Sequence, residues 1–181
     1  MEFKPTKIPD VIEIIPKVWG DERGFFMETY HQPKFAELGL PDIFVQDNHS
    51  FSTQGVLRGL HYQLAPQMQG KLVRCIRGEI WDVAVDIRKA SSTYGQWVAL
   101  TLSAEQKNQL WIPAGFAHGF YTLTPEAEVV YKCTDVYAPD LEQGILWDDA
   151  DLAIDWPLNG QVPNVSPKDL QGCAFSDCTP I

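Results

Sequence analysis

The sequence predicts an all-β fold, a sandwich or barrel assembled from short strands. Short runs rich in β-branched and aromatic residues recur at close spacing and are separated by Gly, Pro, Asn and Asp, which is the rhythm of such folds. The length of 181 residues suggests one domain, residues 1–181. Apolar residues make up 45% of the chain, which is enough for a sizeable core and too many for a disordered protein.

Ten such runs are predicted as strands: Val11–Ile15, Gly24–His31, Ile43–Phe51, Val56–Gln63, Leu72–Ile76, Ile80–Ile87, Trp97–Leu102, Gln109–Ile112, Phe116–Leu123 and Glu128–Thr134. Helical signals are short. Pro33–Leu38 fits about one and a half turns, and Ser166–Asp169 has the Ser cap, first-position Pro and later acid of a helix start. From Ala150 the chain is rich in Pro, Asn and Asp, and we expect it to wrap the sheet as irregular chain.

The run Ile80–Ile87 alternates between two faces, as a strand does. The first face is apolar and holds Trp81, Val83, Val85 and Ile87. The second face holds Ile80, Asp82, Ala84 and Asp86. Because two aspartates share the second face, it is either solvated or lines a polar cavity.

Charge and cysteine content exclude several classes of protein. Lys and Arg number 14 against 24 Asp and Glu, for a net charge of -10, and such a field repels nucleic acid and anionic lipid. No signal-like or membrane-spanning apolar run is present, so we expect a cytoplasmic protein with no nucleic-acid or membrane partner. Cys75 and Cys133 lie in strand-like runs and are predicted core residues. Cys173 and Cys178 could pair, but this cysteine density does not suggest an exported disulfide scaffold.

The most distinctive stretch is Gly55–Gln63, which places Arg58 and His61 in a short, otherwise apolar strand. Arg offers fixed donors suited to phosphate, and His exchanges protons near neutral pH, so the stretch indicates a site. From the strand alone, a core histidine held by a backbone carbonyl is an equal alternative. A flat strand would send Arg58 and His61 to opposite faces. If both serve one pocket, Gly59 must allow a bulge or Arg58 must enter from the rim.

Three other polar side chains have both a structural and a chemical interpretation. Lys71 is in phase with apolar residues, so it lies at a solvated strand end, which is favoured, or in a cavity where an ammonium can hold an oxyanion. Tyr131 is in phase with Val129 and Cys133, a setting in which most tyrosines are core residues. Asp169 fits the acidic partner of a Ser-x-x-Asp capping box, which spacing alone favours.

The loop and strand Pro113–Gly119 match the Pro-x-Gly-x-x-His half-motif of the cupins. The other cupin half-motif, with His-x-His and a later Glu, is absent, since Tyr62 and Gln63 follow His61. A metal cupin needs several nitrogen and oxygen ligands on converging strands. His61 and His118 are too few, so no metal site is predicted.

Ordered motifs run almost end to end along the chain: Gly20–Glu28, Gln46–Ser50, Gly55–Gln63, Gln69–Val73, Trp81–Arg88, Pro113–Gly119, Tyr131, Trp147–Asp149 and Ser166–Asp169. Together they resemble the motifs of the dTDP-4-dehydrorhamnose 3,5-epimerase (RmlC) family. The resemblance implies a cupin-like jelly-roll barrel of antiparallel strands with a few short helices, working as a homodimer without metal or cofactor. It implies an isomerase whose substrate is a dTDP-linked 4-keto-6-deoxyhexose, inverted at C3 and C5 to give dTDP-4-dehydro-L-rhamnose.

The resemblance also implies four catalytic residues. His61 corresponds to the base that removes a proton beside the ketone, and Asp169 orients its imidazole and stabilises the charged form. Lys71 corresponds to the group that stabilises the oxygen at C4. Tyr131 corresponds to the acid that returns a proton from the opposite face. On this interpretation Tyr131 is an acid rather than a core residue, and Asp169 can cap its helix and still face His61.

Substrate contacts are implied by the same resemblance. Arg58 and Lys168 correspond to diphosphate partners, with Arg23 contributed by the neighbouring subunit, which makes a local positive patch on an acidic protein. Tyr137 corresponds to the residue that stacks on the base, and Phe26 flanks it. Further nucleotide and sugar contacts are Glu28, Gln46, Asp47, Asn48, His118 and Glu142.

One departure and three alternatives accompany this interpretation. An Arg commonly precedes the family's Trp-Asn/Asp-Asp motif, and Leu146 stands there in this chain; nothing in the sequence explains the change. A monofunctional 3- or 5-epimerase of a dTDP-4-keto-deoxysugar pathway would share the His, Lys and Tyr. A non-catalytic sugar-nucleotide-binding cupin would not need a base, an enolate stabiliser and an acid together. A metal-dependent cupin oxygenase would hold iron.

Overall fold

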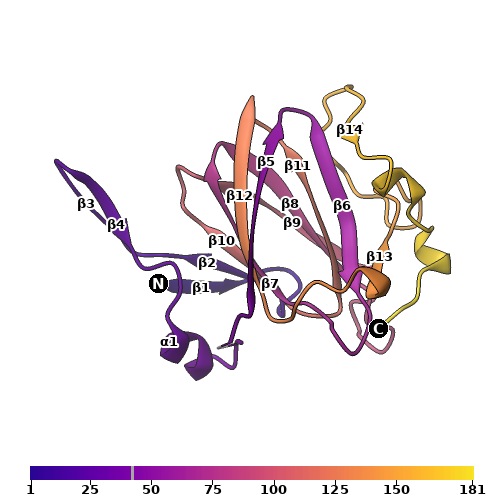
Figure 1. Ribbon diagram of the computed structural model, residues 1–181, viewed down its shortest axis with the longest axis horizontal. Helices are drawn as coiled ribbons and strands as arrows, with labels where there is room; N and C mark the ends of the chain where they lie inside the picture. The colour runs from indigo at the N-terminus through magenta and orange to yellow at the C-terminus, as the bar shows by residue number, and fades with distance from the viewer. Residues whose placement is uncertain (42) are drawn as a thin grey trace.

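The computed structural model describes residues 1–41 and 43–181, and it consists mainly of two sheets (Figure 1). The first sheet has the order β1 (Glu2–Pro5), β2 (Ile12–Ile15), β10 (Gln109–Ile112), β7 (Lys71–Arg77), β12 (Glu126–Cys133), β5 (Gln46–Thr53). The second has the order β13 (Glu142–Gly144), β6 (Val56–Gln63), β11 (Phe116–Thr122), β8 (Glu79–Asp86), β9 (Trp97–Ser103). A short strand, β14 (Asn164–Val165), pairs in parallel with β6.

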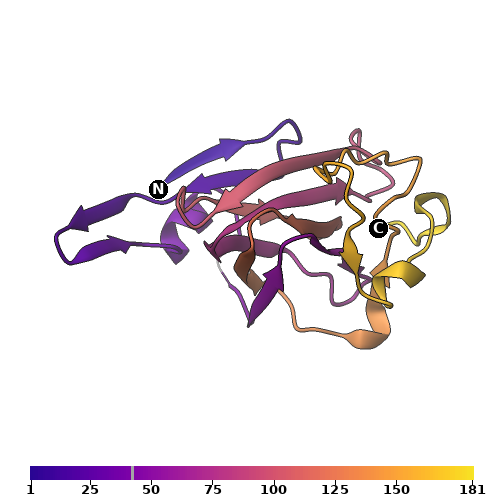
Figure 2. The same ribbon diagram turned by 90° about the horizontal axis from the view of Figure 1, so that it is seen from above.

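The two sheets lie face to face as a jelly roll, which is plain when the molecule is seen from above (Figure 2). The main core lies between them, because residues of both sheets, such as Val73 and Val129 on one and Ile80 and Ala84 on the other, form one buried cluster. All pairings within the main sheet paths are antiparallel. The predicted all-β antiparallel fold is confirmed.

Helices are few and short, as predicted. The six-residue α1 (Gln32–Glu37) coincides with the predicted run, and the His31 side chain caps it by accepting from the Lys34 amide. The remaining helical turns are η1 (Pro139–Leu141), η2 (Asp169–Gln171) and η3 (Phe175–Asp177). Across residues 1–41 and 43–181, none of the helices has the length and apolar character needed to cross a membrane.

Several strand boundaries differ from the prediction. The strand predicted over Gly24–His31 ends at Met27, because the chain then turns into the cap of α1. The run predicted over Ile43–Phe51 becomes a strand from Gln46. β1, β13, β14 and the hairpin strand β3 (Val18–Asp21) were not predicted, since four residues or fewer carry little periodicity.

Strand β8 separates the main core from a second one. Its apolar face, with Val83 and Val85, packs under the C-terminal tail, where Leu152 and Trp156 join the same buried cluster. The tail therefore wraps the sheet, as expected, and it lies beside β6 in Figure 1. The opposite face looks into the space between the sheets, and its Asp82 and Asp86 are both fully buried, so the solvated alternative is wrong for this face.

All four cysteines are free, and Cys75 and Cys133 are buried core residues as predicted. Asp86 is held at the end of β8 by Arg88, Ser91 and Thr93. These contacts hold the pKa of Asp86 at about 2 against the opposing effect of burial. Asp86 is therefore part of the framework, whereas Asp82 remains inside the jelly roll.

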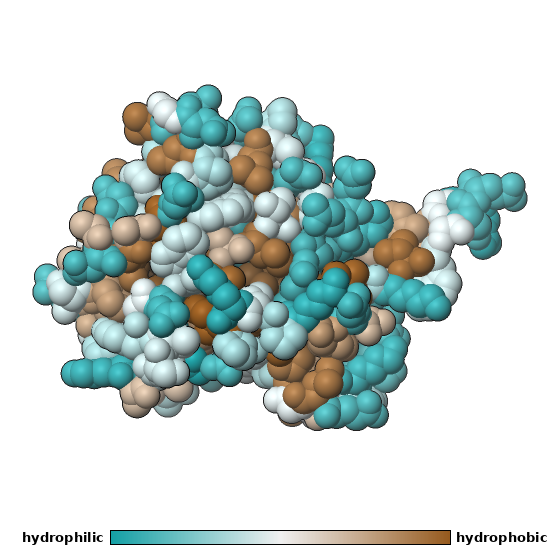
Figure 3. Space-filling model, turned by 180° about the vertical axis from the view of Figure 1, so that it is seen from behind, coloured by the Kyte–Doolittle hydropathy of each residue, from teal (hydrophilic) through white to brown (hydrophobic). Residues whose placement is uncertain are grey.

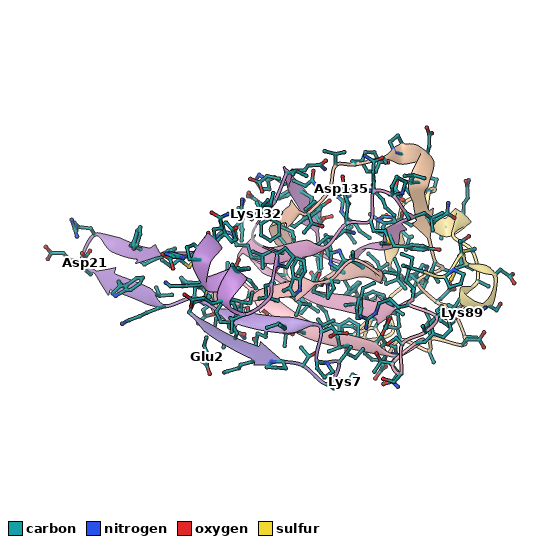
Figure 4. All side chains as sticks on the ribbon, turned by 90° about the horizontal axis from the view of Figure 1, so that it is seen from below. Glu2, Lys7, Asp21, Lys89, Lys132 and Asp135 are labelled. Atoms are coloured by element: carbon teal, nitrogen blue, oxygen red, sulfur yellow. The ribbon has the colours of Figure 1, made fainter. Side chains whose placement is uncertain are left out.

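A hairpin of β3 and β4 (Gly24–Met27) projects away from the two sheets (Figure 1). Asp21 lies at its tip, far from the body of the molecule (Figure 4). The hairpin exposes Trp19, Phe25 and Phe26, which are 49%, 62% and 70% accessible, and hydrophobic atoms lie along it behind a hydrophilic tip (Figure 3). Large apolar side chains this exposed indicate a surface that contacts another molecule.

Candidate active site

A cavity of about 520 Å³ opens between the two sheets. Its walls come from both sheets and from the C-terminal segment, and they carry His61, Lys71, Tyr131, Asp169, Arg58, His118, Tyr137, Glu142 and Lys168. A second hollow of about 260 Å³ shares His61, Lys71 and Tyr131 with it and extends toward Gln46 and Asn48. The structure thus brings together all four residues predicted to be catalytic.

His61 and Asp169 form a direct hydrogen-bonded pair. The His61 Nε2 atom lies 2.7 Å from Asp169 Oδ1. The Asp169 side chain is almost fully buried, and its second oxygen accepts from the amide of Gly59 at 3.3 Å. Burial alone would raise the pKa of Asp169, but the hydrogen bond and charge of His61 and the Gly59 amide together lower it. Asp169 is therefore a carboxylate that accepts from Nε2–H, which leaves Nδ1 of His61 as the basic nitrogen.

The Ser166 hydroxyl holds the backbone of the turn that carries Asp169. It accepts a hydrogen bond from the Asp169 amide at 3.1 Å, which is the capping contact that the spacing predicted. The Asp169 carboxylate, however, accepts from His61 and from the Gly59 amide. The Ser half of the predicted capping box is therefore confirmed, whereas the carboxylate of Asp169, predicted as the acidic partner of that box, is directed to His61.

A bulge in β6 lets Arg58 and His61 face one cavity. On β11, His118 pairs with His61 and Phe120 pairs with Arg58, so two steps on β11 oppose three on β6. Gly59 has a φ of +107°, a conformation that favours glycine. The predicted bulge at this glycine is confirmed. In a regular strand Leu57 would share the face of His61, but beyond the bulge it points the other way and packs in the second core, under the C-terminal tail (the tail-side core).

Lys71 lies inside the molecule, so the solvated alternative for this lysine is wrong. Its Nζ donates to the backbone carbonyl of His61 at 3.4 Å. Burial lowers the pKa of Lys71, while the nearby Cys133, Asp82 and Glu142 oppose that shift. A desolvated ammonium beside His61 is placed to stabilise negative charge on a bound molecule.

Tyr131 enters the cavity from β12, on the other sheet from His61. Burial raises the pKa of Tyr131 above its ordinary value. Its phenol therefore stays protonated at neutral pH and can donate a proton. Base and acid approach the cavity from opposite sheets.

Arg58, Lys168, Glu142 and Tyr137 surround the mouth of the cavity. Arg58 donates to the Ser52 hydroxyl and to the Phe51 carbonyl, both at 3.0 Å, so its guanidinium is held in place. The carboxylate of Glu142 accepts from both Lys168 and Tyr137. The hydrogen bond to Glu142 raises the pKa of Lys168. Two cations thus lie at the entrance of a cavity in an acidic protein.

Residues predicted on β5 divide between its two faces. Gln46 and Asn48 line the extended hollow, and a hydrogen bond of 3.0 Å joins their side chains. Asp47 lies between them in the sequence and therefore points to the outer face, where its carboxylate pairs with Lys132 Nζ at 3.0 Å. Lys132 is labelled in Figure 4. The cavity of this chain therefore does not include Asp47.

Three more predicted contacts lie outside the cavity of their own chain. Arg23 is at the tip of the projecting hairpin and pairs with Asp21. Phe26 is on the same hairpin, and Glu28 follows it and pairs with Lys34. The fold brings none of Arg23, Phe26 and Glu28 to the residues that line the cavity.

Sequence reasoning missed several cavity residues. Ser50, Phe120 and Asn164 line the cavity, and only Ser50 stood in a motif that had been singled out. Asp82, whose strand face had been noted, bonds His118 at 2.8 Å. Among the described residues, no group of three or more His, Cys, Asp or Glu side chains is arranged to hold a metal ion.

A jelly roll whose cavity holds a His paired with a buried Asp, an ammonium and a phenol defines a proton-transfer enzyme of the cupin type. The family model described as dTDP-4-dehydrorhamnose 3,5-epimerase matches residues 5–177. The chain belongs to this family.

Individual relatives agree with this assignment. The chain is 60% identical to a dTDP-4-dehydrorhamnose 3,5-epimerase of Shigella flexneri, over 98% of this chain and 97% of the relative. It superposes with a TM-score of 0.94, at 52% identity, on a 3,5-epimerase of Legionella pneumophila solved with dTDP-4-keto-L-rhamnose, covering 98% and 94% of the two chains. A dTDP-4-dehydrorhamnose 3-epimerase of Streptomyces niveus is 39% identical, over 98% of this chain and 85% of the relative.

Proposed function

We propose that this protein is an isomerase that inverts C3 and C5 of dTDP-4-dehydro-6-deoxy-D-glucose and yields dTDP-4-dehydro-L-rhamnose. The proposal rests on the 2.7 Å contact of His61 with the buried Asp169, in the cavity that also contains Lys71 and Tyr131. The relative of 60% identity and the solved relative with a bound keto-sugar support this substrate class.

The first step is proton abstraction next to the ketone. Nδ1 of His61 takes the proton, and the C–H electron pair moves to form an enolate with its negative charge on O4. The Asp169 carboxylate holds the proton on Nε2 and stabilises the imidazolium. The Lys71 ammonium, buried beside His61, stabilises the enolate oxygen.

The second step is proton return from the opposite side. Tyr131 lies on the other sheet, so its phenol approaches the planar enolate from the side away from His61. The proton moves from the phenol to carbon, the enolate collapses to the ketone, and the configuration is inverted. A water molecule or the His61 imidazolium must then reprotonate the phenolate before the next step.

Arg58 and Lys168 bind the diphosphate at the mouth of the cavity. The guanidinium of Arg58 is held by two hydrogen bonds, and the Lys168 ammonium is held by Glu142. Tyr137, which is half exposed, offers its ring for stacking on the base. His118, Gln46 and Asn48 then contact the remainder of the substrate.

A second copy of the chain completes the site. The hairpin exposes three aromatic rings, and the outer face of the first sheet exposes Phe51 and Ile76. A homodimer would cover this apolar surface, and a hairpin reaching over the partner's cavity would bring Arg23, Phe26 and Glu28 to its substrate. Four free cysteines accord with a cytoplasmic location, where thiols stay reduced.

Incubating the 4-keto substrate in heavy water tests the reaction. We expect deuterium at both C3 and C5 and an L-configured product, with His61→Ala abolishing exchange but retaining dTDP binding. Deuterium at one carbon only would replace this proposal with the monofunctional 3- or 5-epimerase. No exchange at either carbon, despite nucleotide binding, would leave the non-catalytic binding protein.

Mixing two inactive variants tests the shared site. In a mixed dimer of Arg23→Ala with His61→Ala chains, one site receives an intact His61 and the partner's intact hairpin. We expect each variant alone to lose activity and the mixture to regain part of it. If each hairpin served its own chain, mixing would restore nothing.

A further inference from the structure

A second His–Asp pair lies deeper in the jelly roll than the first. His118 Nε2 is 2.8 Å from Asp82 Oδ1, and both side chains are buried, with exposed fractions of 7% and 0%. His118 pairs with His61 across adjacent strands, so the two imidazoles belong to neighbouring positions of one sheet. His118 also lines the 520 Å³ cavity, whereas Asp82 does not.

The Asp82 side chain makes no other hydrogen bond within the described residues. Its second oxygen, Oδ2, is buried and makes no hydrogen bond to any residue in the described part of the chain. An incompletely satisfied buried carboxylate is costly for stability. The residue that gains from Asp82 is His118, through the single hydrogen bond at Oδ1.

We propose that Asp82 is a positioning residue, which fixes His118 as the neutral tautomer protonated on Nε2, so that Nδ1 accepts a hydrogen bond from a sugar hydroxyl beside the ketone. The proposal rests on the function proposed above. In this arrangement Lys71 donates to the ketone oxygen, and Nδ1 of His118 accepts from a hydroxyl.

The protonation state of His118 follows from its surroundings. Burial lowers the pKa of His118, and the charges of Lys71 and His61 act in the same direction, against the attraction of Asp82. The ring is therefore neutral near pH 7 and carries one proton. An ionised carboxylate has no proton to donate and can only accept a hydrogen bond. The ring proton therefore lies on Nε2, between the ring and Asp82.

The remaining nitrogen then decides what His118 can bind. Nδ1 makes no hydrogen bond to a residue of the described ranges, and the ring lines the cavity. Holding a lone pair, Nδ1 accepts from a hydroxyl and repels a carbonyl oxygen. A 4-keto sugar turned so that its ketone faced His118 would leave an acceptor against an acceptor, which disfavours that orientation.

The carboxylate also contributes a counter-charge. Asp82 opposes the lowering of the pKa of Lys71, so it helps to keep that buried ammonium protonated. Asp82 does not line the cavity and acts there through His118 and Lys71. Its removal would therefore disturb both the residue that accepts from the sugar hydroxyl and the residue that stabilises the enolate.

Nitrogen NMR of ¹⁵N-histidine-labelled protein tests the tautomer directly. We expect His118, assigned from the spectrum of His118→Asn, to show a protonated Nε2 and an unprotonated Nδ1 at pH 7. The measurement needs no active enzyme, so it stands even if epimerisation fails. A proton on Nδ1, or a doubly protonated ring, would overturn the proposal in the unmodified protein.

Kinetics of Asp82→Asn test the consequence. The amide is isosteric, but its NH₂ group can donate to Nε2 and move the ring proton to Nδ1. We expect kcat/KM for the 4-keto substrate to fall at least about tenfold, while the Kd for dTDP, which lacks the sugar, stays within about twofold. Equal weakening of dTDP and substrate would indicate a structural role and contradict the proposal.

Non-additivity supplies the last arm of the test. If Asp82 acts mainly through His118, Asp82→Asn adds little to the loss caused by His118→Ala. Fully additive losses would contradict the proposal. Thermal melting of each variant identifies any that fails to fold, and in that case the NMR result on the unmodified protein decides.

Discussion

His61 and Asp169 are 108 positions apart in the chain, yet their side chains meet at 2.7 Å. Three features support the contact: the bulge of β6, the Gly59 amide on the second carboxylate oxygen, and the Ser166 hydroxyl on the Asp169 backbone. Because one carboxylate oxygen accepts from the Gly59 amide, the other is fixed against His61 Nε2 and holds one tautomer of the imidazole. This arrangement leaves Nδ1 of His61 as the nitrogen that can accept a proton.

Replacing Asp169 by Asn therefore removes the charge and the tautomer preference together. The amide can donate to His61 Nε2, which places the ring proton on Nδ1 and blocks the base. We expect kcat to fall by about 10²–10⁴ and the Kd for dTDP to change little. Deuterium exchange into the substrate measures the loss, and a fall of less than about tenfold would show that Asp169 only caps its turn.

The same carboxylate links stability to pH. The pKa of Asp169 is lower in the folded protein than its ordinary value, so folding is favoured by the ionised form. This contribution is present above the unfolded-state pKa of about 3.9 and is lost as the pH falls through the folded pKa. We expect the acid limb of the stability curve to be shallower in Asp169→Asn, measured by denaturant unfolding between neutral and acidic pH. Parallel limbs would contradict this linkage.

Lys71 should set part of the alkaline limb of the rate profile. Its ammonium must be charged to stabilise the enolate, and burial lowers its pKa, so activity is lost as the pH rises through that lowered pKa. We expect Lys71→Gln to reduce kcat by about 10²–10³ and to remove this limb. Lys132→Gln, on the outer face with Asp47, is the matched control and should leave the profile unchanged. An unaltered limb in Lys71→Gln would assign it to another group.

Tyr131→Phe should separate proton removal from proton return. His61 and Lys71 remain, so the substrate still forms its enolate and exchanges with solvent on the side of His61. Net inversion should fall by about 10²–10⁴ because the proton donor on the other sheet is gone. Tyr121→Phe, in the tail-side core, is the control and should retain both activities. Inversion at an undiminished rate in Tyr131→Phe would require a different acid.

Much of the framework could be predicted from local patterns. Strand alternation separated the two faces of β8, and the Gly59 bulge followed from the need to bring Arg58 and His61 to one cavity. The burial of Lys71 could not be predicted, because residue type favours a solvated lysine and only the packing of two sheets encloses it. The Asp82–His118 pair depends on a register between β8 and β11 that neither strand specifies alone.

The catalytic set came from family resemblance and not from spacing. The contact of His61 with Asp169 joins β6 to a turn more than a hundred residues later, and no periodicity reports such a pairing. Of the projecting hairpin, β4 lies within the predicted strand Gly24–His31, whereas β3 was missed, since its four residues resemble any exposed run. Its Arg23 was nevertheless expected from a neighbouring subunit, and that prediction awaits the mixing experiment.

Gly59→Ala should damage both stability and activity. A Cβ at this position would lie 2.5 Å from the His118 carbonyl and 2.6 Å from Gly119 Cα, and φ is +107°. Because backbone atoms cannot yield as a flexible side chain does, we expect a loss of more than about 3 kcal/mol of unfolding free energy. The shift of β6 would also move the Gly59 amide away from Asp169.

Gly39→Ala separates the steric term from the conformational one. Gly39 also has a positive φ, +69°, but nothing lies within 4 Å of its added Cβ, so this change should cost only about 1–2 kcal/mol and leave kcat unaltered. Denaturant unfolding and deuterium exchange on both variants make the comparison. Equal losses in the two variants would mean that β6 relaxes around the methyl group and that the bulge does not hold His61 against Asp169.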